Sequence, residues 1–440
     1  MSRRARGAAL VAALMTLCGG SMGVPAARAQ AYLRWDQSAR PVALGGAAAA
    51  LAEDPSAVFY NPAGIVHLPG THLQAGGTLA VDEARFRAFG GSAFARDEAP
   101  VFDGALYATH TVAERLTGGL GINAPWGLSV EWQDPDVFVG RFRSVESRLG
   151  TVQFNPVLAY GPVGSWSAAL GVDVLDATFD LARFEQDPAL SALGGTAPIA
   201  LAETVLDMGG TAFGWNTALM YRPSERFTAG AQFRSEIEID LSGRTDFTVV
   251  APADLRVIVL PGRETTVGAL LDARYVDQVA RSMLTFPALG VAGISYRPVA
   301  ELLIVVDAQW VGWEAVESIA LAFADTALAE LLPLDYEDAW AVRWGAELEY
   351  RPGLFLRLGY AWQESPAPSP AVTPLLPDAG RDTYSAGFGF DWEGTAVDLA
   401  YRVSVLDDRE GVAFPENTRP ADGIYEGVSH RIGVSLSRPF

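Results

Sequence analysis

The sequence is short of the residues on which much protein chemistry depends. All 32 basic residues are arginine, so Schiff-base lysines, P-loop lysines and Ser-Lys dyads are excluded. Cys18 is the single cysteine and lies near the N-terminus, which leaves the rest of the chain without disulfides, thiolate nucleophiles or cysteine-ligated metals. None of the four histidines has a partner at metal-ligand spacing, and Gly-x-Ser-x-Gly is absent. We therefore expect no enzyme, no metal and no cofactor.

Long apolar runs are also missing, except at the N-terminus. Three arginines, an apolar stretch over 8–17 and the small residues Ala27-Arg28-Ala29 predict a signal peptide at residues 1–29, so that Gln30 begins the mature chain. Helical membrane spans need about 20 apolar residues. Any membrane domain of the mature chain must therefore be built from strands.

Positive charge is scarce relative to negative charge. The chain has 52 acidic residues and a net charge of −20, and removal of a leader with four arginines and no acid lowers it to −24. Phosphate backbones are bound by clustered basic side chains. A nucleic-acid partner is therefore not expected.

What the chain has in quantity is alternation with a period of two. In residues 354–362 large apolar side chains occupy one face and small or polar ones the other, and the same pattern recurs over 384–392 and 397–405. An apolar face toward lipid, a polar face toward a lumen and aromatic residues near strand ends are typical of a transmembrane β-barrel. A soluble β-sandwich also alternates, but glycine and alanine crowd the polar face here, as a filled lumen requires. The prediction is an all-β, antiparallel transmembrane barrel.

The C-terminus supports export to an outer membrane. Alternation continues through Ile432, Val434 and Leu436, and the chain ends at Phe440. This terminal aromatic residue resembles the assembly signal of bacterial outer-membrane proteins, which implies the outer-membrane insertion machinery as a partner.

Three segments break the alternation and predict helices in external loops. They are residues 197–208, where Leu201, Val205 and Met208 would share a face; residues 267–279, where Val267, Leu271, Tyr275 and Val279 repeat; and residues 320–332, which are rich in Ala and Leu.

The stretch at residues 37–70, "QSARPVALGGAAAALAEDPSAVFYNPAGIVHLPG", resembles the N-terminal hatch of the FadL family of outer-membrane transporters of long-chain fatty acids and hydrocarbons. The matching residues are Gly45, Gly46, Asp54, Ser56, Asn61, Pro62, Ala63 and Gly64. The resemblance continues through "GINAPWGLSVEW", "TFPALGVAGISYRP" and "LRLGYAWQESPAP" in family order, whereas the loops, particularly 244–286, depart from the pattern. The alternative to a hatch motif is that Asn61-Pro62 is only a tight turn.

The resemblance implies an architecture and a function. The chain would form a signal peptide (1–29), a hatch (30–72) and a barrel of about fourteen strands (73–440). It would act as a monomer in contact with outer-membrane lipid and lipopolysaccharide, passing fatty acids or aromatic hydrocarbons passively to a lateral opening in the wall. A non-transporting structural or adhesive barrel and a soluble periplasmic binding protein are the alternatives.

Two sets of site residues follow from this comparison. The interruption "NAPWG", with Asn123, Pro125, Trp126 and Gly127, is the expected lateral opening, because proline cannot donate to a strand ladder. The phase of alternation changes at Leu175, which predicts that the chain leaves the lipid belt there. The family places an arginine before a phenylalanine beside the ligand, which implies Arg183 and Phe184, with Leu201, Val205, Met208, Leu271 and Tyr275 as apolar lining. Arg183 could instead be an exposed residue that balances Asp180 and Glu185.

Overall fold

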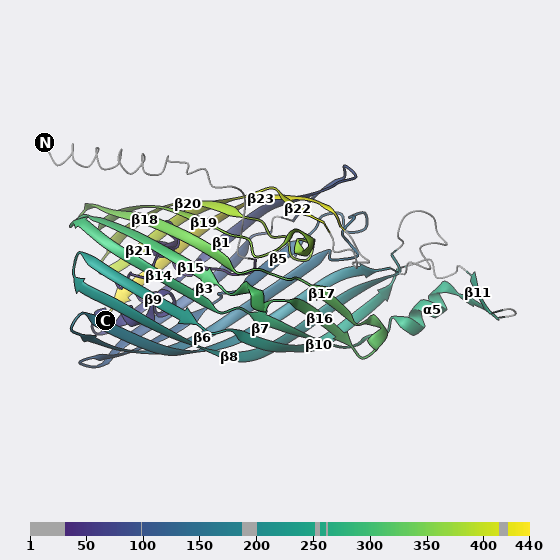
Figure 1. The fold of residues 1–440 in the computed structure, drawn as a ribbon, viewed down its shortest axis with the longest axis horizontal. Coiled ribbons are helices and arrows are strands. Elements are labelled where there is room, and N and C mark those ends of the chain that lie inside the picture. Colours follow the sequence, from purple (N-terminus) through teal and green to yellow (C-terminus); the bar gives the residue numbers. More distant parts are fainter. Residues whose placement is uncertain (1–30, 98, 187–199, 251–255, 261–262, 413–420) are drawn as a thin grey trace.

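A computed structural model describes residues 31–97, 99–186, 200–250, 256–260, 263–412 and 421–440. These residues form a closed antiparallel β-barrel of fourteen strand crossings, which confirms the predicted fold class (Figure 1). The signal peptide predicted for residues 1–29 lies outside the described residues, as does Gln30. Within the described ranges, no helix has the length and apolar character needed to cross a membrane.

Nine of the crossings are single strands. They are β1 (Thr71–Ala88), β3 (Val101–Ala113), β6 (Glu146–Val163), β7 (Trp166–Glu185), β8 (Ala202–Ser224), β19 (Leu354–Gln363), β20 (Arg381–Trp392), β21 (Thr395–Leu406) and β23 (Gly423–Pro439). The first and last strands pair over their whole length, from His72 opposite Pro439 to Ala88 opposite Gly423. This pairing closes the barrel.

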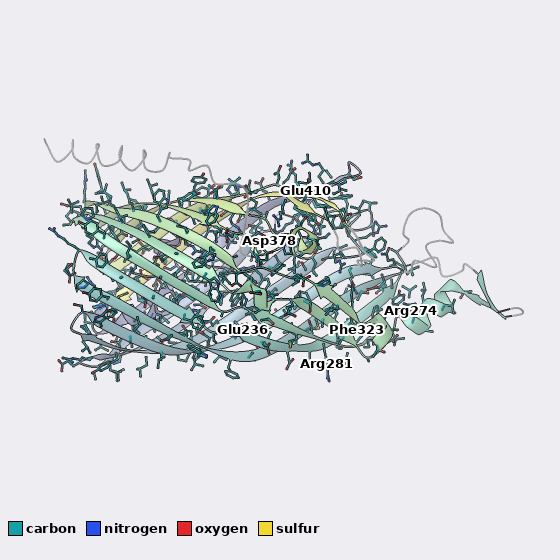
Figure 2. The ribbon with its side chains drawn as sticks, viewed as in Figure 1. Glu236, Arg274, Arg281, Phe323, Asp378 and Glu410 are labelled. Atoms are coloured by element: carbon teal, nitrogen blue, oxygen red, sulfur yellow. The ribbon has the colours of Figure 1, made fainter. Side chains whose placement is uncertain are left out.

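The other five crossings are each interrupted once. Their segments are β4 (Leu116–Asn123) with β5 (Gly127–Glu131), β9 (Phe227–Arg234) with β10 (Ile237–Val249), β13 (Gln278–Phe286) with β14 (Leu289–Val299), β15 (Leu302–Val311) with β16 (Ser318–Phe323), and β17 (Glu330–Pro333) with β18 (Ala339–Arg351). Figure 2 shows Glu236, in the interruption between β9 and β10, partway along the wall and away from both rims.

The shorter elements lie at the rims, beyond the wall, or in residues 31–70 before β1, which we call the hatch segment. They are the strands β2 (Ala93–Ala95), β22 (Arg409–Gly411), β11 (Arg256–Leu260) and β12 (Arg263–Thr266), the helices α2 (Ala39–Ala43), α3 (Ala57–Tyr60) and α5 (Val267–Arg274), and the 3-10 turns η1 (Pro62–His67), η2 (Trp313–Ala315), η3 (Thr326–Leu328) and η4 (Ser369–Ala371). The barrel has short turns at one end and long connections at the other, where α5 and β11 project beyond the rim (Figure 1). Since periplasmic turns are short and external loops long, this arm lies outside the cell.

Two of the three predicted helices are wrong. The described part of 197–208 enters β8, where Val205 is exposed while Leu206 and Met208 are buried. Because apolar residues occur on both faces of this strand, their spacing resembles the repeat of an amphipathic helix. Residues 320–332 form β16, η3 and β17, because cross-strand pairing such as Met283 opposite Ala320 overrides the helix propensity of Ala and Leu. The helix expected over 267–279 is α5, and it ends at Arg274.

Leu175 does not mark the end of a strand. Strand β7 pairs with β8 without a register shift from Trp166 to Glu185, and Leu175 points inward and is fully buried. What changes beyond Val174 is the outer face, where Asp176 and Asp180 replace apolar residues. The lipid belt therefore ends here while the strand continues above it.

The outside of the wall carries the large apolar side chains. Leu170 is 66% exposed and Phe213 is 71% exposed on neighbouring strands, whereas inward positions such as Ser167 and Asp173 are buried. This reversed distribution is the one expected of strands that face lipid.

Candidate functional site

The segment before β1 fills the lumen. From Tyr32 to Ile65 nearly every residue is buried, although these residues form only α2, α3 and part of η1. The segment fits because glycines stand opposite it on the wall: a Cβ on Gly230 would lie 1.8 Å from the Ala49 carbonyl oxygen, and one on Gly359 would lie 2.0 Å from the Gly45 nitrogen. Wall and segment therefore meet backbone to backbone.

Asn61 connects the hatch segment to itself and to the wall. It has the extended backbone expected before proline, with φ −165°, and its side-chain oxygen accepts a hydrogen bond from the Ala63 amide at 3.1 Å. Its amide nitrogen donates to the Ala49 carbonyl at 2.6 Å and to the Leu219 carbonyl of β8 at 3.2 Å. Pro62 begins η1, so Asn61-Pro62 is both a turn and a contact with the wall.

The other motif residues of the hatch segment are buried or nearly so. Gly45 and Gly46 have φ values of +71° and +87°, in the left-handed region that favours glycine, and a Cβ on Gly45 would lie 2.6 Å from the Tyr360 carbonyl oxygen. Asp54 accepts from the Ser56 amide at 3.0 Å, and the Ala63 carbonyl accepts from the Ser167 hydroxyl at 2.7 Å. A Cβ on Gly64 would lie 3.1 Å from Ala52 and Met220.

Ion pairs hold the segment to the wall. Arg40 binds Glu347 of β18 through Nε and Nη2, both at 2.8 Å, and Arg357 of β19 reaches the same carboxylate at 2.6 Å. Asp36 pairs with Arg402 and Arg431 on β21 and β23. Buried charges need such partners, because an unpaired charge in this environment is costly.

The wall has a window beside the predicted lateral opening. Strand β3 pairs with β4 as far as Leu106 opposite Ile122. Beyond this point β5 pairs only with β6 among the described residues, so the start of β3, from Val101 to Ala105, has no partner on that side. Asn123 ends β4 and donates to the Tyr107 hydroxyl at 3.2 Å. An isolated bridge between Arg96 and Trp132 closes the far side of the window.

Residues of the hatch segment occupy this window. The Arg34 amide donates to the Pro125 carbonyl at 2.7 Å, and the Gly127 amide donates to the Tyr32 carbonyl at 2.8 Å. Leu33 forms a bridge with Trp126. The Arg34 side chain pairs with Asp103 of β3. It also packs closely against Gly127, because a Cβ added to Gly127 would lie 2.5 Å from the guanidinium carbon of Arg34. The window is therefore closed by residues 32–34 rather than by a strand.

Aromatic side chains from the strand interruptions surround the start of the hatch segment. We refer to Tyr32, Trp126, Phe286, Trp313 and Tyr336 as the aromatic cluster. Tyr32 lies 4.9 Å from Trp313, 5.9 Å from Trp126 and 6.0 Å from Phe286 between ring centroids, and Trp313 lies 5.9 Å from Tyr336. The cluster lines the lumen beside the window.

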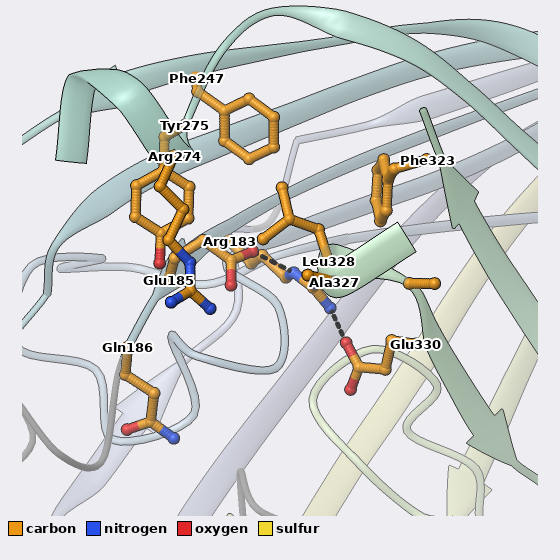
Figure 3. Close-up of a pocket in the computed structure, with 11 residues that line it drawn as sticks. Arg183, Glu185, Gln186, Phe247, Arg274, Tyr275, Phe323, Ala327, Leu328 and Glu330 are labelled. Carbon is orange, nitrogen blue, oxygen red and sulfur yellow. Dashed lines mark hydrogen bonds and ion pairs between the residues drawn. The ribbon is translucent and has the colours of Figure 1, made fainter. Parts of the chain in front are cut away.

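A pocket of about 180 Å³ opens at the extracellular rim. It lies between the end of β7, α5 and the turn that joins β16 to β17 (Figure 3). Arg183 is 2% exposed here, with Nε 3.0 Å from Glu185 and Nη1 2.6 Å from Glu330. It is therefore a buried, paired residue. The alternative of an exposed arginine balancing Asp180 and Glu185 is wrong about the exposure of Arg183, whereas its pairing with Glu185 is present.

The structure brings together only some of the residues expected to line a ligand. Arg183 and Tyr275 line the pocket, and Leu201 and Leu271 pack against Tyr275 beneath it. Phe184 and Met208 belong to the main interior cluster, and Val205 is on the outside of the wall with 44% of its surface exposed. Val205 thus lies on the opposite face from the lumen.

Comparison with known proteins agrees with this architecture. The model of the family described as "Outer membrane protein transport protein (OMPP1/FadL/TodX)" matches residues 22–434. The chain belongs to this family. A long-chain fatty acid transport protein of Salmonella typhi is 24% identical over 406 residues, covering 89% of each chain, and outer membrane protein P1 of Haemophilus influenzae is 24% identical, covering 80% of this chain and 81% of that one.

Solved structures of the FadL/TodX family share the fold. A FadL homologue of Pseudomonas aeruginosa superposes with a TM-score of 0.80 at 16% identity, covering 93% of this chain and all of that one. The toluene transporter TodX of P. putida gives 0.73 at 16% identity, covering 92% and 99%. The chain is therefore an outer-membrane barrel, as its lipid-facing surface requires.

Sequence reasoning missed the aromatic cluster, although the sequence held a signal for it. In this FadL/TodX barrel three of the five aromatic residues stand beside a strand-breaking residue: Trp126 follows Pro125, Phe286 precedes Pro287 and Trp313 follows Gly312. Proline removes a ladder donor at Pro125 and Pro287, and glycine permits a tight bend at Gly312, so each break turns the wall locally and allows a large ring to enter the lumen.

Proposed function

We propose that the protein carries hydrophobic small molecules passively through the outer membrane and releases them sideways through the window between β3 and β5. The observation that carries this proposal is that residues 32–34 of the hatch segment, and not a neighbouring strand, close the window. A hatch segment that withdraws from the wall would open a path from the lumen to the lipid.

The polarity of the wall agrees with sideways release. Outward residues up to Ile122 on β4 and Val174 on β7 are apolar, and the next three outward residues of β7 are Asp176, Thr178 and Asp180. On β3, at the edge of the window, Phe102 is apolar and 68% exposed, so this edge faces lipid. An apolar molecule that leaves there passes into lipid without crossing water, so burial of its surface favours release.

The substrate class follows from the relatives. A relative is named a fatty acid transport protein and a structural neighbour a toluene transporter, so we propose long-chain fatty acids or aromatic hydrocarbons. In this proposal the segment before β1 acts as the hatch, the rim pocket with Arg183 captures the molecule, and the chain from β1 onward forms the wall, so the wall begins two residues before the predicted boundary at residue 73. The protein works as a monomer, since one barrel contains the pocket, the lumen and the window.

A reversible cross-link tests the window. The mature chain has no cysteine, and Leu33 and Trp126 are bridge partners, whose Cα separation suits a disulfide. In cells carrying the double variant Leu33→Cys, Trp126→Cys, uptake of the fluorescent probe N-phenylnaphthylamine should stop on oxidation and return on reduction. The two single-cysteine variants control for the substitutions. Equal uptake by the oxidised and reduced double variant would show that the window is not the exit.

A further inference from the structure

The aromatic cluster provides a seat for one flat ring. Tyr32 occupies it, with edge-to-face contacts to Trp313 and Phe286 at interplanar angles of 89° and a tilted contact to Trp126 at 58°. Edge-to-face packing is a favoured arrangement of aromatic rings. The wall thus supplies three rings around a six-membered ring that belongs to the hatch segment.

The seat also contains a hydrogen-bond acceptor for a phenolic hydroxyl. The Tyr32 hydroxyl donates to the Thr285 carbonyl oxygen of β13 at 2.8 Å, and Tyr32 is only 6% exposed. A phenol is therefore already bound in this position, as part of the chain. If Tyr32 leaves, the Thr285 carbonyl loses this donor.

Two side-chain donors of the cluster have no partner among the described residues. They are Nε1 of Trp313, which is 0% exposed, and the hydroxyl of Tyr336, which is 3% exposed. Buried polar groups are normally paired, and an unpaired donor is destabilising. An acceptor atom on a ligand would satisfy either of them.

We propose that the aromatic cluster is a binding site for small phenols. The ligand ring takes the place of Tyr32. Its hydroxyl either donates to the Thr285 carbonyl, as the Tyr32 hydroxyl does, or accepts from Trp313 Nε1 or the Tyr336 hydroxyl, which the Tyr32 hydroxyl does not reach. A methyl group in place of the hydroxyl makes neither bond, so the site prefers phenol to toluene, which has nearly the same shape. This inference rests on the proposed function, because the ligand reaches the cluster only through the lumen.

The test compares two probes that differ only in this group, 4-fluorophenol and 4-fluorotoluene. Fluorine NMR measures their binding to the purified full-length chain in detergent micelles, with empty micelles as the reference. In the Tyr32→Ala variant, which vacates the seat, 4-fluorophenol should bind about tenfold more tightly than 4-fluorotoluene, and more tightly than it binds the unaltered protein. Equal affinity for the two probes would overturn the inference.

Substitutions that remove the two donor groups identify their role. Added to Tyr32→Ala, Tyr336→Phe keeps its ring and Trp313→Phe keeps a smaller aromatic side chain without the indole N–H. Together they should reduce the preference for 4-fluorophenol over 4-fluorotoluene. Tyr425→Phe is the matched control, since it deletes another buried hydroxyl without a described partner, in a separate group with Phe86 and Trp132.

The outcomes separate the inference from the proposed function. If both probes bind equally, or if the donor variants weaken both alike, the inference fails and transport of hydrophobic molecules stands. If neither probe binds a folded barrel, the phenol site fails, and uptake of N-phenylnaphthylamine then decides the proposed function independently.

Discussion

Arg40 of the hatch segment and Glu347 of β18 form a two-bond ion pair, with both nitrogen–oxygen distances at 2.8 Å. The two residues are 307 positions apart and both are buried. This is the ion pair between α2 and the wall, and it adds to the packing of Val42 and Ala43 against Ala400 of β21. It is therefore the contact whose loss should loosen the hatch segment without opening the barrel.

Arg40→Ala should weaken attachment of the hatch segment by about 1.5–3 kcal/mol, because the charged hydrogen bonds to Glu347 are lost while Glu347 keeps Arg357 as a partner. Planar-bilayer recordings should show frequent open events that the unaltered protein lacks. Arg222→Ala is the control, since its partner Glu225 is 89% exposed and such pairs contribute little. Equal recordings from the two variants would contradict the prediction.

Asn61→Ala and Pro62→Ala should each alter uptake of a hydrophobic probe with little effect on barrel yield. Asn61 loses its bonds to the Ala49 and Leu219 carbonyls, whereas the strand ladder uses neither residue. Folded yield is measured by heat-modifiable gel migration and uptake by probe fluorescence in cells. Thr211→Ala, which removes an exposed bond on the outer wall, is the control. Normal uptake by both hatch variants would mean that the two residues form only a turn.

Arg183 and Glu330 should have opposite effects on a ligand that carries a carboxylate. Such a ligand must replace Glu330 at the Arg183 guanidinium, so Arg183→Ala should weaken fatty acid binding about tenfold, while Glu330→Gln should strengthen it. An uncharged hydrocarbon of similar size should bind both variants like the unaltered protein. Fatty acid binding that falls in both variants would show that the pair only holds the rim together.

Acid should release the hatch segment through Glu53. Burial alone would raise the pKa of Glu53, but Arg40 and Arg297 more than offset this and hold that pKa below its usual range. A carboxyl group whose pKa is lower in the folded protein stabilises the folded state fully above its unfolded-state pKa, which is about 4.3 for Glu. This stabilisation is lost as the pH falls through the folded-state pKa. Channel conductance should therefore rise in acid below about pH 4, and Glu53→Gln should remove this step. An unchanged acid profile in the variant would assign the step to another group.

Phe440 should matter for insertion through its ring. Its amide donates to the Thr71 carbonyl at 2.8 Å, and its side chain is 73% exposed on the outside of the barrel. Deleting Phe440 should leave the protein exported but lower the folded yield, because the insertion machinery reads the final strand. Phe440→Ala keeps the backbone bond and should have the same effect, whereas Phe440→Tyr should not. Heat-modifiable gel migration measures the folded yield. Normal folding of the deletion variant would show that Phe440 is not an assembly signal.

The alternation of the wall could be predicted from sequence because a lipid-facing strand repeats every two residues regardless of its neighbours. The prediction failed where the inner face is also apolar. Leu206 and Met208 point into the lumen while Val205 points outward, so no single face marks the strand. Ala320 and Leu321 were misread because their strand is determined by pairing with β13, which is remote in sequence.

The candidate site was only partly predictable for the same reason. Asn61 and Pro62 form a local motif, and Pro125 breaks a strand by its own chemistry. Arg183 has one near partner, Glu185, which the sequence offered, but its second partner, Glu330, lies 147 positions away. Spacing along the chain carries no information about such a pair, and therefore an arginine expected to meet a ligand is found between two carboxylates.

The close approach of Gly230 and Gly359 to the hatch segment determines which positions of this protein can vary. The atoms they meet are the Ala49 carbonyl oxygen and the Gly45 amide nitrogen, which every residue type provides. Exchange of the Ala49 side chain leaves this contact intact, whereas any side chain at Gly230 displaces the segment. Ala49 is nevertheless fully buried, and Gly45 has a positive φ and little room for a Cβ of its own. Hatch and wall therefore restrict each other, and a larger side chain on either one requires a matching change on the other.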